Sequence, residues 1–187
     1  APTATSLPTA TAAPSPTFPD KVQLLGEIQL HTLPGIGHNP RAVAVLGGRV
    51  YVANRNTNNV SVIEGNRVSA VIPVGAAPMA LAADDTTGLV YVANEGDNSI
   101  SFISGNGVVR TVPAPESPSC LLALDGRLYA GGRGEDAVAV LDGLSGERLA
   151  TVPLSATIGV LALAVNPVEG LLYAGVYDHV QILSLRD

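Results

Sequence analysis

The sequence contains no tryptophan, one cysteine and one lysine, and aromatic residues make up only 4% of its 187 residues. Hydrophobic residues still account for 47%, so the core has to be built from Val, Leu, Ile and Ala, which favours tightly packed sheets. Cys120 cannot form an internal disulfide, and its apolar surroundings indicate a small buried hydrophobic residue. No apolar run reaches the roughly 20 residues of a membrane-spanning helix.

Positive charge is also scarce. Ten Lys and Arg stand against sixteen Asp and Glu, which gives a formal net charge of −6, and the basic residues form no cluster. Because phosphate backbones are bound by concentrated positive charge, this balance excludes nucleic acid as the expected partner.

Residues 1–19 carry no charge and consist almost wholly of Ala, Pro, Thr and Ser. Such a segment buries too little apolar surface to fold, and we expect a disordered linker before a domain at 20–187. Pro/Thr-rich spacers commonly separate a membrane anchor or signal from an exported domain, which predicts an extracytoplasmic protein, secreted or held at the surface by a tether. The alternative is the disordered tail of a cytoplasmic protein.

From Lys21 onward the chain repeats with a period near 40. The tyrosines of "RVYVAN", "LVYVAN", "RLYAGG" and "LLYAGV" are separated by 40, 38 and 44 residues: Tyr51, Tyr91, Tyr129 and Tyr173. Each unit alternates short apolar strands with Gly/Asn-rich turns, and none shows a helical period. Four strands per unit predict an all-β propeller with blades at about 41–74, 79–113, 120–154 and 160–185.

The segments "YVAN", "NNVSVIEGNRVSAVIPVG" and "YVANEGDNSISFI", with a proline before each inner strand, resemble the YVTN-type β-propeller repeat. The resemblance covers about residues 21–187 and is stronger in the first two units than in the last two. It implies a propeller in an exported or surface protein, usually a binding or scaffolding module. It implies no catalytic residues.

The last unit stops after its third strand, whereas "KVQLLGEIQL" at 21–30 precedes the first unit and resembles an outer strand. We therefore expect the N-terminal strand to complete the last blade by pairing with 179–185, which would close a four-bladed monomer without exposed edges. Two alternatives remain, a dimer that forms one eight-bladed ring and a fragment of a longer propeller.

One face of such a ring collects the loops between second and third strands, where binding residues would concentrate. The candidate ligand-binding residues there are Arg55, Glu95, Asp97, Arg133 and Asp136. Closure would also gather His31, His38, Asp178 and His179, whose side chains suit zinc. The acidic residues Glu95, Asp97, Glu135 and Asp136 suggest a calcium site or a glycosidase. Solvated histidines and ordinary polar turns are the alternatives that we favour, so no cofactor is predicted.

The expected function is a non-catalytic module that binds a protein or glycan partner outside the cell. The alternative is an enzyme, a hydrolase or a lactonase-like activity, with its site at the axial mouth of the propeller. Such an enzyme would need ionisable side chains near the axis, where the predicted inner strands carry Ala, Val and Leu.

Overall fold

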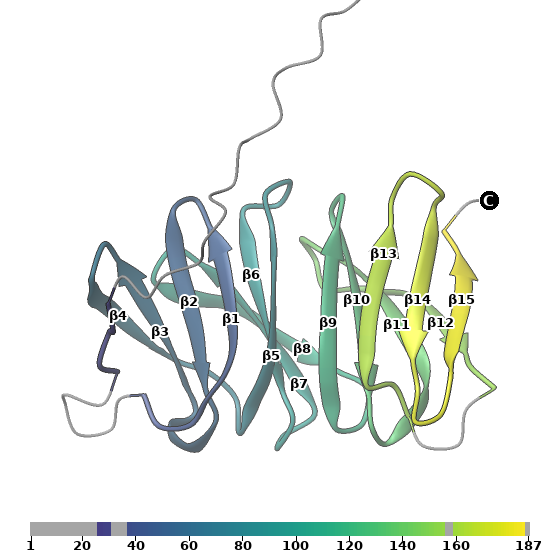
Figure 1. Cartoon of the computed structure of the whole chain (residues 1–187), viewed down its shortest axis with the longest axis horizontal. Helices are drawn as coiled ribbons and strands as arrows, with labels where there is room; N and C mark the ends of the chain where they lie inside the picture. The colour runs from purple at the N-terminus through teal and green to yellow at the C-terminus, as the bar shows by residue number, and fades with distance from the viewer. Residues whose placement is uncertain (1–25, 31–36, 156–158, 186–187) are drawn as a thin grey trace, which may run out of the picture.

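The computed structural model describes residues 26–30, 37–155 and 159–185, and this part of the chain forms four antiparallel sheets (Figure 1). The first sheet contains β1 (Pro40–Leu46), β2 (Arg49–Asn54), β3 (Asn59–Glu64) and β4 (Arg67–Pro73), with a 3-10 turn at Arg55–Thr57. The second contains β5 (Pro78–Asp84), β6 (Leu89–Asn94), β7 (Ser99–Ser104) and β8 (Gly107–Pro113). The third contains β9 (Pro118–Leu124), β10 (Arg127–Gly132), β11 (Glu135–Asp142) and β12 (Arg148–Pro153). The fourth contains β13 (Ala162–Asn166), β14 (Leu171–Gly175) and β15 (Val180–Ser184).

The strands within each sheet follow one another in chain order, as in the blade of a propeller. We call the sheets blades 1 to 4. Their inner strands β1, β5, β9 and β13 lie side by side across the front of Figure 1, and each contacts the next. The predicted all-β, blade-like architecture is therefore confirmed, and the predicted blade limits agree with the strands to within a few residues.

Neighbouring blades are held together by one apolar layer per junction. The layer between blades 1 and 2 contains Tyr51, Val60 and Val62 of blade 1 packed with Val90 and Val92 of blade 2. The layers at the next two junctions contain Tyr91 and Tyr129 in the same place. Each of these repeat tyrosines thus packs toward the following blade, which explains why the tyrosines recur at the repeat period.

Two of these tyrosines also form a hydrogen bond across the junction. The Tyr51 hydroxyl donates to the carbonyl oxygen of Gly105 in blade 2 (3.3 Å), and the Tyr91 hydroxyl donates to that of Gly143 in blade 3 (3.1 Å). Gly143 has to be glycine for this contact, because a Cβ there would lie 2.8 Å from the Tyr91 hydroxyl oxygen. Burial raises the pKa of Tyr91, which keeps the hydroxyl protonated as a donor.

The expected closure of a four-bladed ring is wrong for this chain. The blades form an open array, with blades 1 and 4 at its two ends (Figure 1). The last blade has only three strands among the described residues, and 26–30 form no strand and lie beside Arg67–Val71 of β4 instead of β15. Residues 21–25 of the predicted strand, and the linker 1–19, lie outside the described residues. Blade 1 packs on blade 2, blade 2 on blade 3 and blade 3 on blade 4, which leaves blades 1 and 4 at opposite ends of the array (Figure 1).

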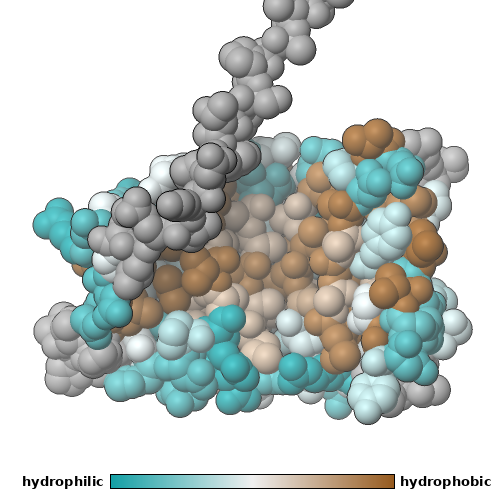
Figure 2. All heavy atoms as spheres, in the orientation of Figure 1, coloured by the Kyte–Doolittle hydropathy of each residue, from teal (hydrophilic) through white to brown (hydrophobic). Residues whose placement is uncertain are grey.

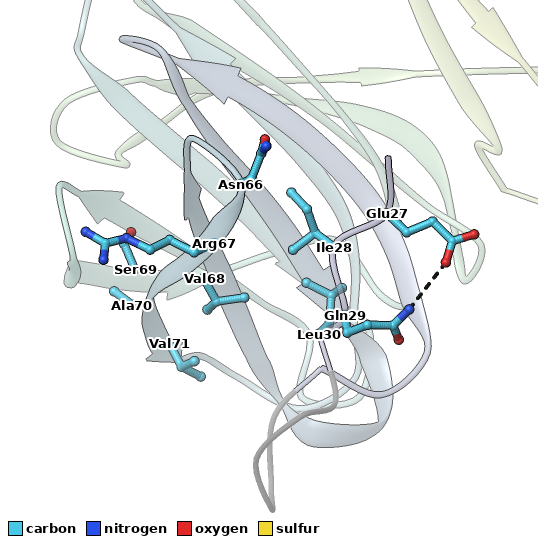
Figure 3. Close-up of a pocket in the computed structure, with 10 residues that line it drawn as sticks. All are labelled: Glu27, Ile28, Gln29, Leu30, Asn66, Arg67, Val68, Ser69, Ala70 and Val71. Carbon is cyan, nitrogen blue, oxygen red and sulfur yellow. Dashed lines mark hydrogen bonds between the residues drawn. The ribbon is translucent and has the colours of Figure 1, made fainter. Parts of the chain in front are cut away.

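The segment 26–30 nevertheless has the side-chain alternation of a strand. Ile28 and Leu30 point toward Val68 of β4, whereas Glu27 and Gln29 point away and are joined by a 3.4 Å hydrogen bond (Figure 3). A shallow groove separates the segment from β4. Among the described residues, no helix is long and apolar enough to cross a membrane.

Replacing Tyr91 by Phe tests the junction hydrogen bond. The change removes the donor to Gly143 and the 2.7 Å contact with the Thr87 hydroxyl while keeping the ring in the apolar layer. We expect the free energy of unfolding to fall by about 1–2 kcal/mol, measured by chemical denaturation. Tyr177→Phe is the matched control: this side chain is exposed, so we expect a change within about 0.5 kcal/mol. Equal effects of the two changes would contradict the account.

Candidate functional site

The loops between second and third strands lie along the lower edge of Figure 1, and one row of side chains belongs to these loops. Each blade contributes the residue that stands four places after its repeat tyrosine, namely Arg55, Glu95, Arg133 and Tyr177. We call these four residues the loop row. The loops that carry the row lie at the lower rim of the molecule, which is largely polar and lies below an apolar band (Figure 2).

Two ion pairs join the first three members of the loop row. The Arg55 Nη2 atom lies 2.9 Å from Glu95 Oε2, and the Arg133 Nη1 atom lies 3.1 Å from Glu95 Oε1. The Glu95 side chain is only 16% exposed, whereas those of Arg55 and Arg133 are 37% and 48% exposed. One carboxylate therefore orients two guanidinium groups from different blades, and the trio carries one net positive charge that solvent can reach.

Backbone hydrogen bonds fix the positions of these residues in the same way in three blades. The amide of each donates to the carbonyl oxygen of the linker residue that precedes the blade's inner strand: Arg55 to Asn39 (3.0 Å), Glu95 to Ala77 (3.1 Å) and Arg133 to Ser117 (3.0 Å). Each acceptor has a left-handed φ of 51–60° and is followed by the proline that begins the inner strand. Three of the four members of the loop row, Arg55, Glu95 and Arg133, are thus held by the scaffold itself.

A second repeated contact ties each loop to the next blade. The Oδ1 atom of an Asn or Asp accepts a hydrogen bond from the amide of the next linker: Asn58 from Ala77 (2.9 Å), Asn98 from Ser117 (2.8 Å) and Asp136 from Gly159 (2.7 Å). We call these the linker anchors. Asp136, predicted as a ligand-binding residue, therefore has an anchoring contact. Asp97 accepts hydrogen bonds from the Ala76 amide (2.9 Å) and the Ser99 hydroxyl (2.7 Å).

Of the predicted ligand-binding residues, the structure joins Arg55, Glu95 and Arg133 in one group. Sequence reasoning missed Tyr177, which is 73% exposed in blade 4. The signal was available, because Tyr177 stands at the same distance from its repeat tyrosine as the other three members. Asp97 lies in the same loop as Glu95 and Asp136 lies at the start of β11, and one carboxylate oxygen of each already accepts a backbone amide.

Buried asparagine side chains directly precede two members of the loop row. Asn94 is fully buried, and its Nδ2 atom donates to the hydroxyls of Ser99 and Ser101, both at 2.9 Å. Asn54 makes the same arrangement with Asn59 and Ser61 in blade 1. These asparagine side chains thus form hydrogen bonds across the hairpin between the second and third strands. In blade 3, Gly132 stands at the place of the asparagine, and Ala137 and Ala139 stand at the places of its two hydrogen-bond acceptors. Blade 3 therefore has neither the donor amide nor the acceptors.

Asn94→Ala should therefore cost more than the loss of one side chain. It leaves the buried Ser101 hydroxyl and the partly buried Ser99 hydroxyl without the Asn94 donor, and we expect a loss of about 1–3 kcal/mol in the free energy of unfolding. Adding Ser99→Ala and Ser101→Ala should restore part of this loss, since blade 3 is built that way. A triple variant that loses the sum of the three single effects in chemical denaturation would contradict this account.

The proposed zinc ligands are not brought together within one chain. His38 precedes β1 in blade 1, whereas Asp178 and His179 lie in the β14–β15 loop of blade 4, at the other end of the array (Figure 1). His31 lies outside the described residues. The ring Nδ1 of His179 lies 2.6 Å from Asp178 Oδ1, and this hydrogen bond holds the pKa of Asp178 below its ordinary value. No group of three or more His, Cys, Asp or Glu within the described ranges could hold a metal ion.

The acidic residues considered for calcium each have a protein partner. Glu95 is paired with two arginines, Asp97 and Asp136 accept backbone amides, and Glu135 Oε1 lies 3.9 Å from Arg148 Nη1.

Cys120 is buried in the layer between blades 3 and 4. Its Sγ atom lies 3.7 Å from the carbonyl oxygen of Gly131 and 3.8 Å from that of Val160, and burial raises the thiol pKa to about 11. Because thiolate is the reactive form, this environment suppresses nucleophilic chemistry.

Two consequences of the Cys120 environment can be measured. At pH 8 the folded protein should react with iodoacetamide far more slowly than the protein unfolded in guanidinium. The raised folded-state pKa also means that stability is retained below pH 9 and decreases as the pH rises from 9 toward 11. Cys120→Ala should show a shallower decrease over that range in pH-dependent denaturation. Equal labelling rates of folded and unfolded protein would contradict the burial.

No protein-family model and no curated protein sequence matches the chain. Among solved structures, hydrazine synthase of Kuenenia stuttgartiensis matches with a TM-score of 0.73 and 18% identity, over 88% of this chain and 50% of that one. The computationally designed Ika8 protein matches with a TM-score of 0.65 and 15% identity, over 78% of this chain and 46% of that one. The likeness is one of fold. This chain spans about half the length of both.

Proposed function

We propose that this protein is a non-catalytic β-propeller module that binds a carboxylate-bearing partner, a protein segment or an acidic glycan, at the loop row. The observation that carries the proposal is the Arg55–Glu95–Arg133 group, whose three residues come from three consecutive blades and in which one largely buried carboxylate orients two partly exposed guanidiniums. Guanidinium groups bind carboxylates through paired hydrogen bonds, and Glu95 uses only part of this donor capacity.

Tyr177 extends the proposed site toward blade 4. An exposed tyrosine offers a flat apolar ring and a hydroxyl at low entropic cost, which suits contact with a sugar ring or a peptide side chain. The rigid backbone contacts beneath the row limit the entropy lost on binding.

An enzymatic site at the axial mouth is the less supported alternative. It would require several ionisable groups on the inner strands. The described inner strands carry two charged residues, Arg41 of β1, which is exposed, and Asp84 of β5, which is buried and accepts the backbone amides of Thr86 and Gly126.

The proposed location is outside the cytoplasm, with a membrane tether through the N-terminal region as one form of it. This part of the proposal rests on the Ala/Pro/Thr/Ser composition of residues 1–19 and on the resemblance to YVTN-type repeats.

Binding of polygalacturonate and of a poly-glutamate peptide, measured by calorimetry, tests the site. We expect binding that weakens with added salt and that is reduced about tenfold or more by Arg55→Gln or by Arg133→Gln. Arg110→Gln is the matched control, because it removes the same charge from the exposed outer strand β8. If Arg110→Gln weakens binding as much as the loop variants, attraction to the surface at large explains the data. If neither probe binds the unmodified protein, the proposal is wrong.

A further inference from the structure

The two ends of the array expose surfaces that are buried at every internal junction. In β15, Val180 and Ile182 are 59% and 62% exposed. In the other blades, the third-strand residues at the same register relative to the repeat tyrosine are all buried. They are Val60 and Val62 in blade 1, Ile100 and Phe102 in blade 2, and Val138 and Val140 in blade 3. Tyr173 is likewise the one repeat tyrosine that is not fully buried. We call Tyr173, Val180 and Ile182 the trailing face.

Blade 1 exposes the opposite half of the same junction. Val43 and Val45 of β1 are both 62% exposed. Their counterparts Leu81 and Ala83 in β5 pack against the tyrosine layer of blade 1, and Leu121 and Ala123 in β9 pack against that of blade 2. We call Val43 and Val45 the leading face. The leading face therefore has no preceding blade to pack against, and the trailing face has no following blade to pack against.

A polar contact is also divided between the two ends. The linker anchors Asn58, Asn98 and Asp136 stand two residues before Val60, Ile100 and Val138, the first residues of the buried pairs named above, and each accepts the amide of the next linker. Asp178 stands at the same place in blade 4, with a side chain that is 76% exposed. Asn39, with φ of 60° before Pro40, occupies the linker position that such an anchor would bind.

We propose that the leading and trailing faces bind each other between two copies of this chain, which together close one eight-bladed ring. A second copy is the occupant that the structure favours, because it supplies both missing surfaces and both halves of the divided linker contact.

The N-terminal segment fits the same arrangement. Within the chain, each outer strand leads directly into the inner strand of the next blade, as β4 leads into β5. Residues 26–30 lead toward β1 and lie beside β4, and outer strands of adjacent blades such as β4 and β8 also contact each other (Figure 3). The segment therefore occupies the place of the outer strand of a preceding blade. In the ring, it becomes the fourth strand of the partner's blade 4, whose edge strand is β15.

Ring closure would also extend the loop row. Tyr177 of one copy would be followed by Arg55 of the other, so that the row continues around the whole axis. This inference concerns assembly and does not depend on the proposed ligand, because mass can be measured without any ligand present.

The first test is the molar mass of the full chain by size-exclusion chromatography with light scattering. One chain has a mass of 19.0 kDa, so we expect twice 19.0 kDa, about 38 kDa, for the ring. Val43→Glu and Ile182→Lys should each give a folded 19.0 kDa species, with folding checked by circular dichroism and a thermal melt. Val109→Lys is the matched control: Val109 is 61% exposed on β8, away from both faces, so the dimer should persist.

Mixing the two monomeric variants makes the test specific for head-to-tail closure. A mixed pair has one unmodified junction and one junction at which the two introduced side chains face each other with opposite charges. The mixture should therefore dimerise when neither variant does alone. Asp178→Ala should weaken the unmodified dimer about tenfold through loss of the linker contact. A monomeric unmodified chain, a larger assembly, or a mixture that stays monomeric would overturn the proposal.

Discussion

Each of blades 1 to 3 buries its repeat tyrosine and two third-strand side chains against the inner strand of the next blade. The described chain contains three such junctions, and each excludes water from an apolar layer made largely of Val, Leu, Ile and Ala. With few aromatic residues, the chain places its tyrosines where they contribute most area, and two of them add a hydrogen bond across the junction. The spacing of the blades, and hence of every loop, follows from this contact.

These junctions also set the relative positions of the residues in the loop row. Arg55, Glu95 and Arg133 belong to different blades, yet they meet because each is fixed by a backbone hydrogen bond to its own linker. The linker anchors then tie each loop to the following blade. A ligand at the row would thus contact groups that are positioned before it binds, which reduces the entropy lost on binding.

The repeat period and the strand alternation predicted the strands and blades closely, because both are local properties of the sequence. The prediction of a closed four-bladed ring was wrong. Ring closure depends on the angle between neighbouring blades, and this angle is set by side-chain packing and cannot be inferred from a short sequence pattern. Asp97 and Asp136 were predicted to bind ligand because acidic loop residues look alike in sequence, whereas their backbone partners are visible only in the fold. The recurrence of Asn58, Asn98, Asp136 and Asp178 at one place in the repeat was the signal for an anchoring role. Tyr177 was missed although its place in the repeat was readable.

The claim that the two ends of the array form one more copy of the internal junction is tested most directly by a cross-link at the linker anchor. In a Cys120→Ala background, Asn39→Cys and Asp178→Cys would place one thiol on each of the two residues that the proposed anchor contact joins, as Ala77 and Asn58 are joined between blades 1 and 2. The account predicts a disulfide between two chains, seen as a dimer on a non-reducing gel that reverts on reduction. A disulfide within a single chain, or two thiols that stay free, would contradict it.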